Sequence, residues 1–500
     1  MKYKLLSFLM GILLLITILG GCKMKELAIN TIAELDYFYS NPSDIDNIGD
    51  PYVLKASDGF YYMFCTSADT GYFCWKSADL IHWTDKKMAY KRTKNSWAMT
   101  CFWAPEVVES DGVYYMYYTA KNKEGSLRIG VAISSSPDGP YEEALDKPLF
   151  DYGYAAIDAH VFIDEDGKKY LYYSRDCSEN FQNKVQVSEI YGVSLNENML
   201  SVDGEPVLLT TPSQVWETGS ISPVWNEGPE MIKHNGIYYL TYSGNCFSSR
   251  AYSVGYATSD APLGTFTKYS ANPILTAGSY PEISGSGHHS FTTSPDGKEI
   301  FMVYHTHKDP SVGGGNRQVN IDRIVFTETG ELHVNGPTMS YQPVPSDGIL
   351  TNVAVSADIT YQKEPVSLLN DSIFTIHKKD KAYDWIADVD DKHPVKVRIT
   401  FPKEKTISSI LVYRGVTDDT DFSYYKVEID GKYLLPDCYL SEEAIQRAAI
   451  TAFEPISAKE LTLTFFPKEN TNKISLSEII ILGSDLDDIS YKSSEYKINT

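Results

Sequence analysis

The clearest pattern along the chain is a short polar turn followed by a strand in which aromatic and β-branched residues alternate with smaller or polar ones. It occurs five times, as DGFYYMFCTS, DGVYYMYYTA, DGKKYLYYSR, NGIYYLTYSG and DGKEIFMVYHTH, beginning at Asp58, Asp111, Asp166, Asn235 and Asp296. An Asp-Gly or Asn-Gly pair ahead of such a segment is typical of a β-hairpin. The repeated pattern, without long helical periodicity, predicts an all-β protein.

The spacing of the repeats predicts how the hairpins assemble. Successive copies begin about 50 to 70 residues apart, long enough for one four-stranded blade of a β-propeller. A second alternating segment that ends in a polar turn follows most copies, as VGYATSDAPLGTF follows the fourth. We therefore predict a five-bladed β-propeller over residues 36–345. A repetitive β-sandwich or a solenoid is the alternative arrangement.

The pattern changes after the last repeat. Residues 337–348 are rich in proline and lack a strand pattern, which is typical of a linker. Short strand-like segments follow: VKVRITF, ISSILVYRG, YYKVEID, ELTLTFF and SLSEIIILG. They predict a β-sandwich over residues 352–484, with a tail over residues 485–500.

The N-terminus has the organisation of a targeting segment. Two lysines precede an apolar run over residues 5–19, which is short for a helix that spans a bilayer. The Leu-Gly-Gly-Cys sequence that follows is the pattern of a bacterial lipoprotein signal. We expect a signal peptide over residues 1–21, lipid attachment to Cys22 and a linker over residues 22–35. An ordinary cleaved signal peptide is the alternative.

A protein anchored in this way is held on the membrane by its lipid alone, in the bacterial cell envelope and facing out of the cytoplasm. Export permits disulfides, but six further cysteines in so long a chain do not make a disulfide scaffold. Cys65 and Cys74 flank a predicted hairpin and either pair or remain as buried thiols.

Charge narrows the classes of partner. The formal net charge is −22, with 44 basic and 66 acidic residues. A nucleic-acid-binding protein needs a basic surface, so we expect no nucleic-acid partner. A neutral ligand such as a sugar is compatible with this charge.

Three carboxylates share one position relative to the repeats. Asp50, Asp158 and Glu227 each lie eight residues ahead of the turn of their own repeat. The innermost strands of a propeller converge on a central channel, so residues at equivalent positions ring one of its mouths. We therefore expect these three side chains to meet there. Isolated turn or capping carboxylates are the alternative.

The chain resembles glycoside hydrolase family 43 over about residues 36–345. The resemblance is carried by Gly-Asp-Pro at Asp50, Trp-Ala-Pro at Trp103, Ile-Asp-Ala at Asp158, Glu-Gly-Pro at Glu227 and Gly-His at His288. The family implies a five-bladed propeller that hydrolyses arabinosides and xylosides with inversion of configuration. By this resemblance Asp50 is the general base, Glu227 is the general acid, and Asp158 orients the acid and raises its pKa.

The chemistry of inversion agrees with these roles. One carboxylate must be ionised to activate water, and another must be protonated to donate to the leaving oxygen. A third carboxylate beside the acid disfavours ionisation of the acid by like-charge repulsion. Glu230 is the rival candidate for the acid but is expected to be structural, and Glu106 is expected to be structural or to lie at the rim of the site.

Further residues are expected to contact substrate. Trp103, Phe102 and Trp225 are candidates for the apolar wall that packs against a sugar ring. Arg317 follows a glycine-rich loop and is a candidate for hydrogen bonds to sugar hydroxyls or to the base. A position in a surface loop is the alternative for Arg317.

A metal is implied only through the resemblance. In the family the Gly-His position faces the central channel and often helps to hold calcium through waters, and His288 matches this position. Because calcium prefers oxygen ligands, one histidine among waters makes a weak site. We expect no required cofactor, and an optional calcium ion near the propeller centre. Packing in the core is the alternative for His288.

The predicted sandwich resembles discoidin-type domains through Asp384-Trp385, ISSILVYRG and LSEIIILG. That resemblance implies a jelly-roll that binds carbohydrate or packs on its neighbour.

Together these features predict an inverting glycosidase that acts on side chains of plant-type polysaccharides or on oligosaccharides. An exo-acting α-L-arabinofuranosidase is the first choice, and a β-xylosidase or a galactose-directed enzyme (galactofuranosidase or galactosidase) is the second. The alternative from another class is a non-catalytic, carbohydrate-binding surface lipoprotein. Such a binder would not need three aligned carboxylates.

Overall fold

The computed structural model of the protein describes residues 24–484, apart from 220–221, 354–357, 361–365, 390–393 and 441–447. The predicted signal peptide, Cys22 and the predicted tail over residues 485–500 lie outside the described residues. The chain divides into two compact units, Asp36–Gly348 and a second that joins residues 24–35 to the described residues from Ile349 onward. The described part contains no helix whose length and apolar character would let it span a membrane.

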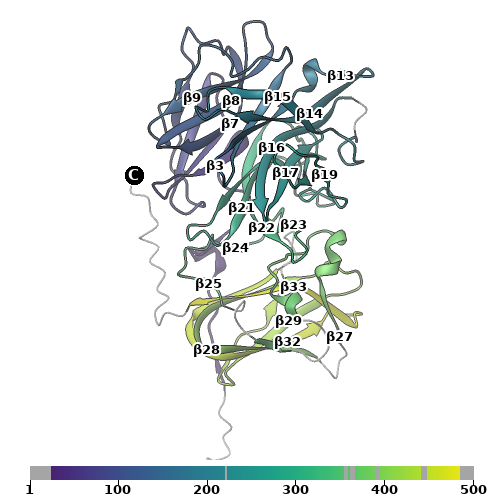
Figure 1. Ribbon diagram of the computed structural model, residues 1–500. Coiled ribbons are helices and arrows are strands. Elements are labelled where there is room, and N and C mark those ends of the chain that lie inside the picture. Colours follow the sequence, from purple (N-terminus) through teal and green to yellow (C-terminus); the bar gives the residue numbers. More distant parts are fainter. Residues whose placement is uncertain are drawn as a thin grey trace, which may run out of the picture. The chain divides into compact units, whose positions relative to one another are not determined.

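The strands described in the first unit form a five-bladed β-propeller with four strands in each blade (Figure 1). Blade 1 contains β3 (Asp46–Lys55), β4 (Tyr61–Thr66), β5 (Gly71–Ser77) and β6 (Lys87–Lys91). Blade 2 contains β7 (Thr100–Ser110), β8 (Val113–Lys121), β9 (Leu127–Ser134) and β10 (Glu142–Glu143). Blade 3 contains β11 (Ala156–Ile163), β12 (Lys169–Arg175), β14 (Val185–Leu195) and β15 (Val202–Thr210), with the short β13 (Phe181–Gln182) paired to β14.

Blade 4 contains β16 (Val224–His234), β17 (Ile237–Gly244), β18 (Ser253–Ser259) and β19 (Thr267–Lys268). Blade 5 contains β20 (Gly287–Thr293), β21 (Ile300–His307), β22 (Arg317–Phe326) and β23 (Leu332–Val334). The five sequence repeats are the hairpins that join the innermost strand of each blade to the second one. The propeller predicted from these repeats is confirmed.

Aromatic side chains hold neighbouring blades together. One buried cluster contains Phe64 and Tyr72 of blade 1 together with Phe102 and Tyr118 of blade 2. Full burial of a large apolar side chain contributes roughly 1.5–3 kcal/mol, so such a cluster stabilises the radial stacking of the sheets. The tyrosine-rich strands of the sequence are therefore the interfaces between blades.

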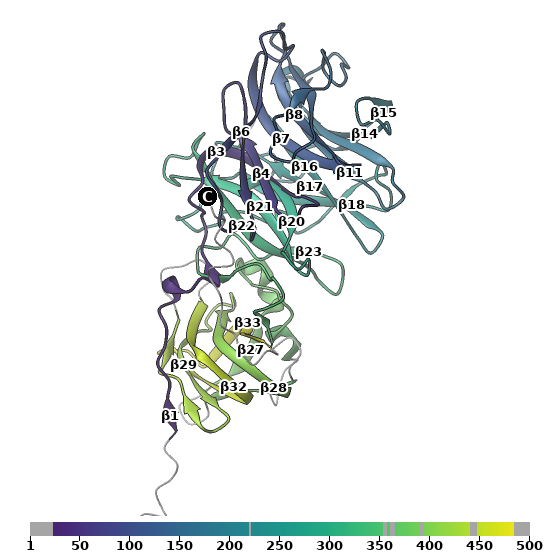
Figure 2. The ribbon, with the colours of Figure 1, turned by 90° about the vertical axis from the view of Figure 1, so that its left-hand side faces the viewer.

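The ring of blades is closed by pairing between its ends. β22 of blade 5 pairs with β3 of blade 1, and Figure 2 shows β20, β21 and β22 beside β3 and β4. Outside the blades, β2 (Phe38–Tyr39) pairs with β24 (Gln342–Pro343). The first and last segments of this unit are thus tied to each other.

The second unit is a β-sandwich built on two long strands, β28 (Val395–Arg414) and β32 (Ala448–Pro467). Register shifts between Thr400 and Lys405 and again near Ser409 divide their pairing into successive segments. The sequence predicts VKVRITF and ISSILVYRG as separate strands, but both belong to β28. β28 still pairs with β32 beyond the first register shift, and this continued pairing makes both predicted segments part of one strand.

The other elements of this unit are short apart from two. They are β25 (Thr351–Asn352), β26 (Asp358–Thr360), η4 (Val366–Leu369), η5 (Lys378–Tyr383), β27 (Trp385–Asp388), β29 (Phe422–Ile429), β30 (Tyr433–Leu434), β31 (Cys438–Tyr439) and β33 (Lys473–Ser484). Trp385 is fully buried in the core of the sandwich.

Residues 22–35, which the sequence assigns to a linker, are organised differently where the structure describes them. β1 (Lys25–Glu26) pairs in parallel with β30, Leu27 packs in the core of the sandwich, and η1 (Ile32–Glu34) follows. The exposed edge of a sheet offers unpaired backbone groups, and this segment satisfies them. The linker assignment misses this because the pairing partner lies far along the sequence.

Cys65 and Cys74 are both buried and free. Cys74 lies opposite Phe64 in the pairing of β4 with β5. Cys65 follows Phe64, so its side chain points to the other face of the sheet. The alternative of two buried thiols is therefore the one that the structure adopts.

Candidate active site

Each innermost strand carries a β-bulge at the same place, where its register with the second strand shifts. The residues at the bulge have positive φ: Asp50 (54°), Ala104 (38°), Asp158 (55°), Gly228 (56°) and His288 (45°). A non-glycine residue rarely adopts this conformation, and it persists only where the surrounding structure enforces it. The conformation is repeated in all five blades, around one end of the channel, and glycine adopts it without strain in blade 4.

The predicted equivalence of the three carboxylates is only partly right. Asp50 and Asp158 occupy the bulge position of their blades, whereas Glu227 lies one residue earlier, at the position of Ile157. Its equal distance from the turn arises because the blade 4 turn is shorter: His234 pairs with Ile237 across two residues, whereas Ile163 pairs with Lys169 across five in blade 3. The offset in the sequence therefore does not measure a position in the blade.

The structure nevertheless brings the three carboxylates together in one pocket of about 600 Å³. All but one of the predicted site residues line this pocket: Asp50, Asp158, Glu227, Trp103, Trp225, His288 and Arg317. The indoles of Trp103 and Trp225 provide apolar surface beside the carboxylates, and Trp103 is 37% exposed.

Phe102 is the exception. Its side chain is only 2% exposed, and its ring packs against Tyr72, Tyr90 and Tyr118 between blades 1 and 2. Phe102 and Trp103 are neighbours on one strand, so their side chains point to opposite faces of the sheet. Phe102 is therefore a core residue, and its assignment to the substrate wall is wrong.

Asp50 lies among hydrogen-bond donors and positive charge. Its Oδ1 accepts a hydrogen bond of 2.8 Å from Arg317 Nη1, and its Oδ2 accepts one of 2.6 Å from Thr66 Oγ1. His288 Nδ1 is 3.4 Å from Oδ1. Burial opposes ionisation of Asp50, but the charge of Arg317, with smaller contributions from His288, His305 and Thr66, holds the pKa of Asp50 well below its usual range.

Gly49 makes this arrangement possible. A Cβ atom at this position would lie 1.8 Å from Nη2 of Arg317. Only glycine therefore lets the guanidinium lie across the backbone next to Asp50. Gly49 and Asp50 thus form one structural unit with Arg317 of blade 5.

Glu227 has the opposite environment. Its Oε1 accepts a hydrogen bond of 2.9 Å from the hydroxyl of Tyr252, which is itself fully buried. Burial and, after it, the charge of Asp158 raise the pKa of Glu227 well above its usual range. Asp158 Oδ2 accepts a hydrogen bond of 3.1 Å from the backbone N–H of Gly228, the residue after Glu227.

Asp158 has an intermediate acidity. Burial raises its pKa to about 6; the charge of His288 opposes the increase and the charge of Asp50 adds to it. The pocket therefore contains one carboxylate that ionises easily and one that retains its proton. Asp158 is coupled electrostatically to both of them.

His288 offers at most one ligand to a metal. Its ring nitrogen faces Asp50, whose carboxylate is already paired with the cation of Arg317. Calcium takes six to eight oxygen ligands, so most ligands of a calcium ion here would have to be waters, and the optional calcium stays a prediction. The backbone N–H of His288 donates to Ser243 Oγ, 2.8 Å away, which fixes the ring at the channel.

Sequence reasoning misses three residues that hold this site. Thr66 and Tyr252 bind the carboxylates directly, and His305 Nδ1 accepts a hydrogen bond of 3.2 Å from the backbone N–H of Asp50. Thr66 ends the second strand of blade 1, and His305 lies on the second strand of blade 5, each opposite a bulge. Alignment of the repeats could therefore have identified both residues. Tyr252 lies in a loop before β18, and its local sequence gives no signal.

A five-bladed propeller with a pocket of buried carboxylates of opposed acidity defines a glycoside hydrolase that works by acid–base chemistry. The chain belongs to the glycosyl hydrolases family 43, whose family model matches residues 39–332, and it hydrolyses O-glycosyl bonds with inversion. The family resemblance found in the motifs is thus confirmed.

Individual relatives cover the same region. The chain is 32% identical over 281 residues to a β-D-galactofuranosidase of Aspergillus niger, covering 53% of this chain and 74% of the relative. It is 28% identical over 291 residues to an extracellular exo-α-(1→5)-L-arabinofuranosidase of Streptomyces chartreusis, covering 55% of this chain and 84% of the relative. Among solved structures, a thermostable family-43 glycoside hydrolase is similar with a TM-score of 0.60 and 48% identity, over 62% of this chain and 99% of that one.

Proposed function

We propose that Asp50 is the general base, Glu227 the general acid and Asp158 the residue that keeps the acid protonated. The observation that carries these assignments is the opposed acidity of Asp50 and Glu227 in one pocket. A base must be ionised and an acid protonated at the same pH, and here Arg317 favours the first state while Asp158 favours the second. Inversion further requires a separation of about 6.5–9.5 Å between the two carboxyl groups, which leaves room for water.

In the proposed reaction, Asp50 takes a proton from a water molecule as the oxygen of that water bonds to the anomeric carbon. Glu227 donates its proton to the glycosidic oxygen as the bond between that oxygen and the anomeric carbon breaks. The products are an alcohol and a free sugar of inverted configuration. Exchange of one proton with solvent at each carboxyl group restores the starting state.

We further propose that the substrate is a terminal α-L-arabinofuranosyl unit on a plant-type polysaccharide side chain or an oligosaccharide. Support comes from the exo-α-(1→5)-L-arabinofuranosidase relative and from the pocket, where Trp103 and Trp225 supply the apolar surface for a sugar ring. A β-D-galactofuranoside is the second candidate, because the A. niger relative has that activity in its name. The two sugars share their ring stereochemistry and differ by an exocyclic hydroxymethyl group. A β-xylosidase activity is the third.

The test is a comparison of nitrophenyl α-L-arabinofuranoside, β-D-galactofuranoside and β-D-xylopyranoside at equal concentrations. The proposal expects the arabinofuranoside to have the largest kcat/KM. A higher value for the galactofuranoside would replace the first candidate with the second. Products from linear and branched arabino-oligosaccharides then distinguish release of single sugars from internal cleavage.

The remaining proposals concern the ends of the chain. We infer that Cys22 carries lipid in the cell envelope and that the C-terminal sandwich is discoidin-like and binds carbohydrate. The apolar run before Cys22 and the Asp384-Trp385 motif support these inferences. Cys22→Ala should move the enzyme from the membrane fraction to the soluble fraction. Recovery of the unaltered protein as a soluble species would refute the anchor.

A further inference from the structure

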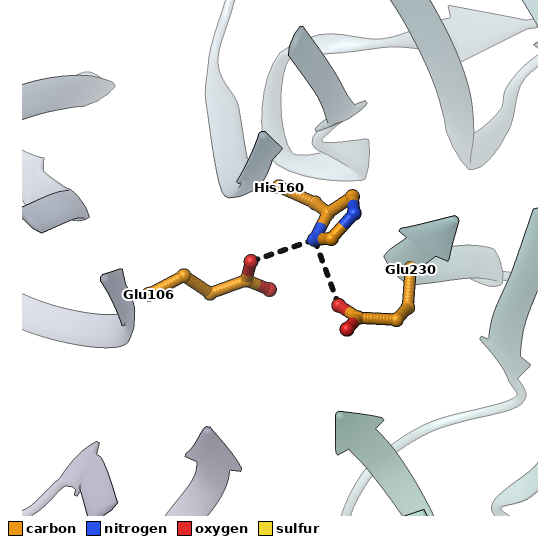
Figure 3. Close-up of side chains that lie close together, drawn as sticks. All are labelled: Glu106, His160 and Glu230. Atoms are coloured by element: carbon orange, nitrogen blue, oxygen red, sulfur yellow. Dashed lines mark hydrogen bonds and ion pairs between the residues drawn. The ribbon is translucent and has the colours of Figure 1, made fainter. Parts of the chain in front are cut away.

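A second group of ionisable side chains lies deeper in the channel, three residues beyond Trp103, Ile157 and Glu227 on their strands. Nδ1 of His160 on β11 is 2.8 Å from Oε2 of Glu106 on β7 and 2.8 Å from Oε2 of Glu230 on β16. Figure 3 shows both carboxylates pointing at this one ring nitrogen. None of the three residues lines the active-site pocket.

The hydrogen bonds of this cluster are incomplete. A single N–H group does not satisfy two carboxylate oxygens at once, and only the contact to Glu106 has the geometry of a hydrogen bond. Oε2 of Glu230 and Nε2 of His160 have no hydrogen-bond partner, although these residues are only 4% and 5% exposed. Oε2 of Glu230 thus lacks the hydrogen bond that a buried carboxylate oxygen normally has, and a cation at the centre of the three side chains would compensate for it.

Among the ion pairs of the described residues, His160 is the one positive partner of Glu106 and Glu230, and none joins either glutamate to a lysine or an arginine. The other oxygen of Glu230 accepts a hydrogen bond of 3.3 Å from the backbone N–H of Phe291, and this orients Oε2 toward the histidine. The charges of both glutamates also act on Tyr52, which adds no positive charge.

We propose that Glu106, His160 and Glu230 bind one divalent first-row transition ion, of the zinc or manganese type, in the propeller channel. The ligand atoms lie within 4.8 Å of one another, and an ion at their centre would contact all three. Neighbouring ligands of a tetrahedral ion with bonds of roughly 2.0–2.2 Å lie about 3.3–3.6 Å apart, so each 2.8 Å contact of His160 would have to lengthen by less than about 1 Å to admit it. Two carboxylates and a neutral imidazole would balance the charge of the ion.

The donor set favours a small transition ion over calcium. Imidazole nitrogen suits zinc and its neighbours, and carboxylates suit zinc and manganese as well. Calcium needs longer bonds and six to eight oxygen ligands. The site therefore differs in place and in chemistry from the calcium expected at His288.

The ion would link strands from three blades. Glu106, His160 and Glu230 come from the innermost strands of blades 2, 3 and 4 and share the same register position. A bond from each to one ion would add a cross-link between strands that belong to different blades. Its effect would be on stability, since a ligand that binds only the folded state raises the unfolding temperature.

The test uses the tag-free protein, stripped with a chelator and then titrated with zinc chloride alone. Bound zinc is counted by elemental analysis after gel filtration, and unfolding is followed by calorimetry. We expect one zinc ion per chain and a rise of about 3 °C or more in the unfolding temperature at saturating zinc. Neither readout depends on the glycosidase assignment. The metal proposal and the proposed function can therefore fail independently of each other.

Two variants locate the ion. Glu230→Gln and Glu106→Gln each remove one charged ligand with little change in volume, and each should weaken zinc binding about 10-fold or more. Glu109→Gln, farther along β7 and outside the cluster, is the matched control and should bind zinc as the unaltered protein does. Failure to bind stoichiometric zinc, or equal binding by all three variants, would overturn the proposal.

Discussion

The channel of the propeller contains two levels of buried ionisable groups, and they behave differently. The upper level contains Asp50, Asp158 and Glu227 around the pocket, and the lower level contains Glu106 and Glu230 around His160. Each level has a member on β11 and on β16, a few residues apart. Carboxylates make up most of both levels.

The difference lies in the placement of the neighbouring charges. In the upper level Arg317 lowers the pKa of Asp50, whereas burial and Asp158 raise that of Glu227. In the lower level, burial followed by the charge of Glu230 raises the pKa of Glu106 to about 8. Burial opposes the charge of His160, but the two glutamates raise its pKa to about 10. The neighbouring charges of the upper level therefore separate Asp50 from Glu227 in acidity, whereas both glutamates of the lower level act on one histidine.

The largest effect is expected from Asp50→Asn, which removes the base of the upper level. Hydrolysis should fall about 10³-fold, within the range for a lost general base, and substrates with good and poor leaving groups should suffer alike. Steady-state kcat/KM on aryl glycosides and on oligosaccharides checks this. Activity close to that of the unaltered enzyme would show that Asp50 is not the general base.

Glu227→Gln should be almost as damaging, but only where the leaving group needs a proton. Oligosaccharide hydrolysis should fall about 10³-fold, while dinitrophenyl glycosides, whose leaving group departs unprotonated, should lose far less. The ratio of the two losses is the measurement. Equal losses on both substrates would contradict the role of acid.

Asp158→Asn should cost less, about 10- to 100-fold in kcat, and should change the pH profile. Its negative charge helps to hold the proton on Glu227, so without it the pKa of Glu227 falls. The alkaline limb of kcat, which reports loss of that proton, should move to lower pH. An unmoved limb would show that Asp158 does not act through Glu227.

Gly49→Ala tests the effect of Arg317 on the pKa of Asp50. The new methyl group would displace the Arg317 guanidinium, and burial would then raise the pKa of Asp50 with less opposition. The acid limb of kcat/KM should therefore move to higher pH. Gly315→Ala, which has open space at its Cβ position in the loop before Arg317, is the control and should leave the profile unchanged.

The smallest effect is expected from Glu230→Gln in the lower level. Because Glu230 does not line the pocket, kcat/KM should change far less than the roughly 10²–10⁴-fold that loss of a catalytic acid costs. The same Glu-to-Gln change at position 227 is the matched comparison. A large loss selective for poor leaving groups would reassign the acid to Glu230.

Much of the molecule is determined locally by the sequence. The five turn-and-strand repeats predict the blades because Asp-Gly and Asn-Gly turns and alternating aromatic strands act over a few residues. The motifs around Asp50, Asp158 and Glu227 likewise identify the family. The sequence also offers Trp103 and Arg317 as candidates for substrate contact, and both line the pocket.

Only the tertiary structure decided the rest, because the deciding contacts join distant segments. The sequence offset made Glu227 look equivalent to Asp158, but pairing across the hairpin sets its true register. Phe102 looked like a substrate residue until the alternation of β7 placed it between blades.

The pKa of each carboxylate likewise depends on residues that are distant in the sequence but adjacent in the structure. Arg317 reaches Asp50 from the last blade, and Tyr252 reaches Glu227 from a loop with no motif of its own. Glu106 and Glu230 meet at His160 only because three blades converge on one axis. Local patterns fix strands and turns, whereas pKa values and ligand sets arise from distances that closure of the propeller creates.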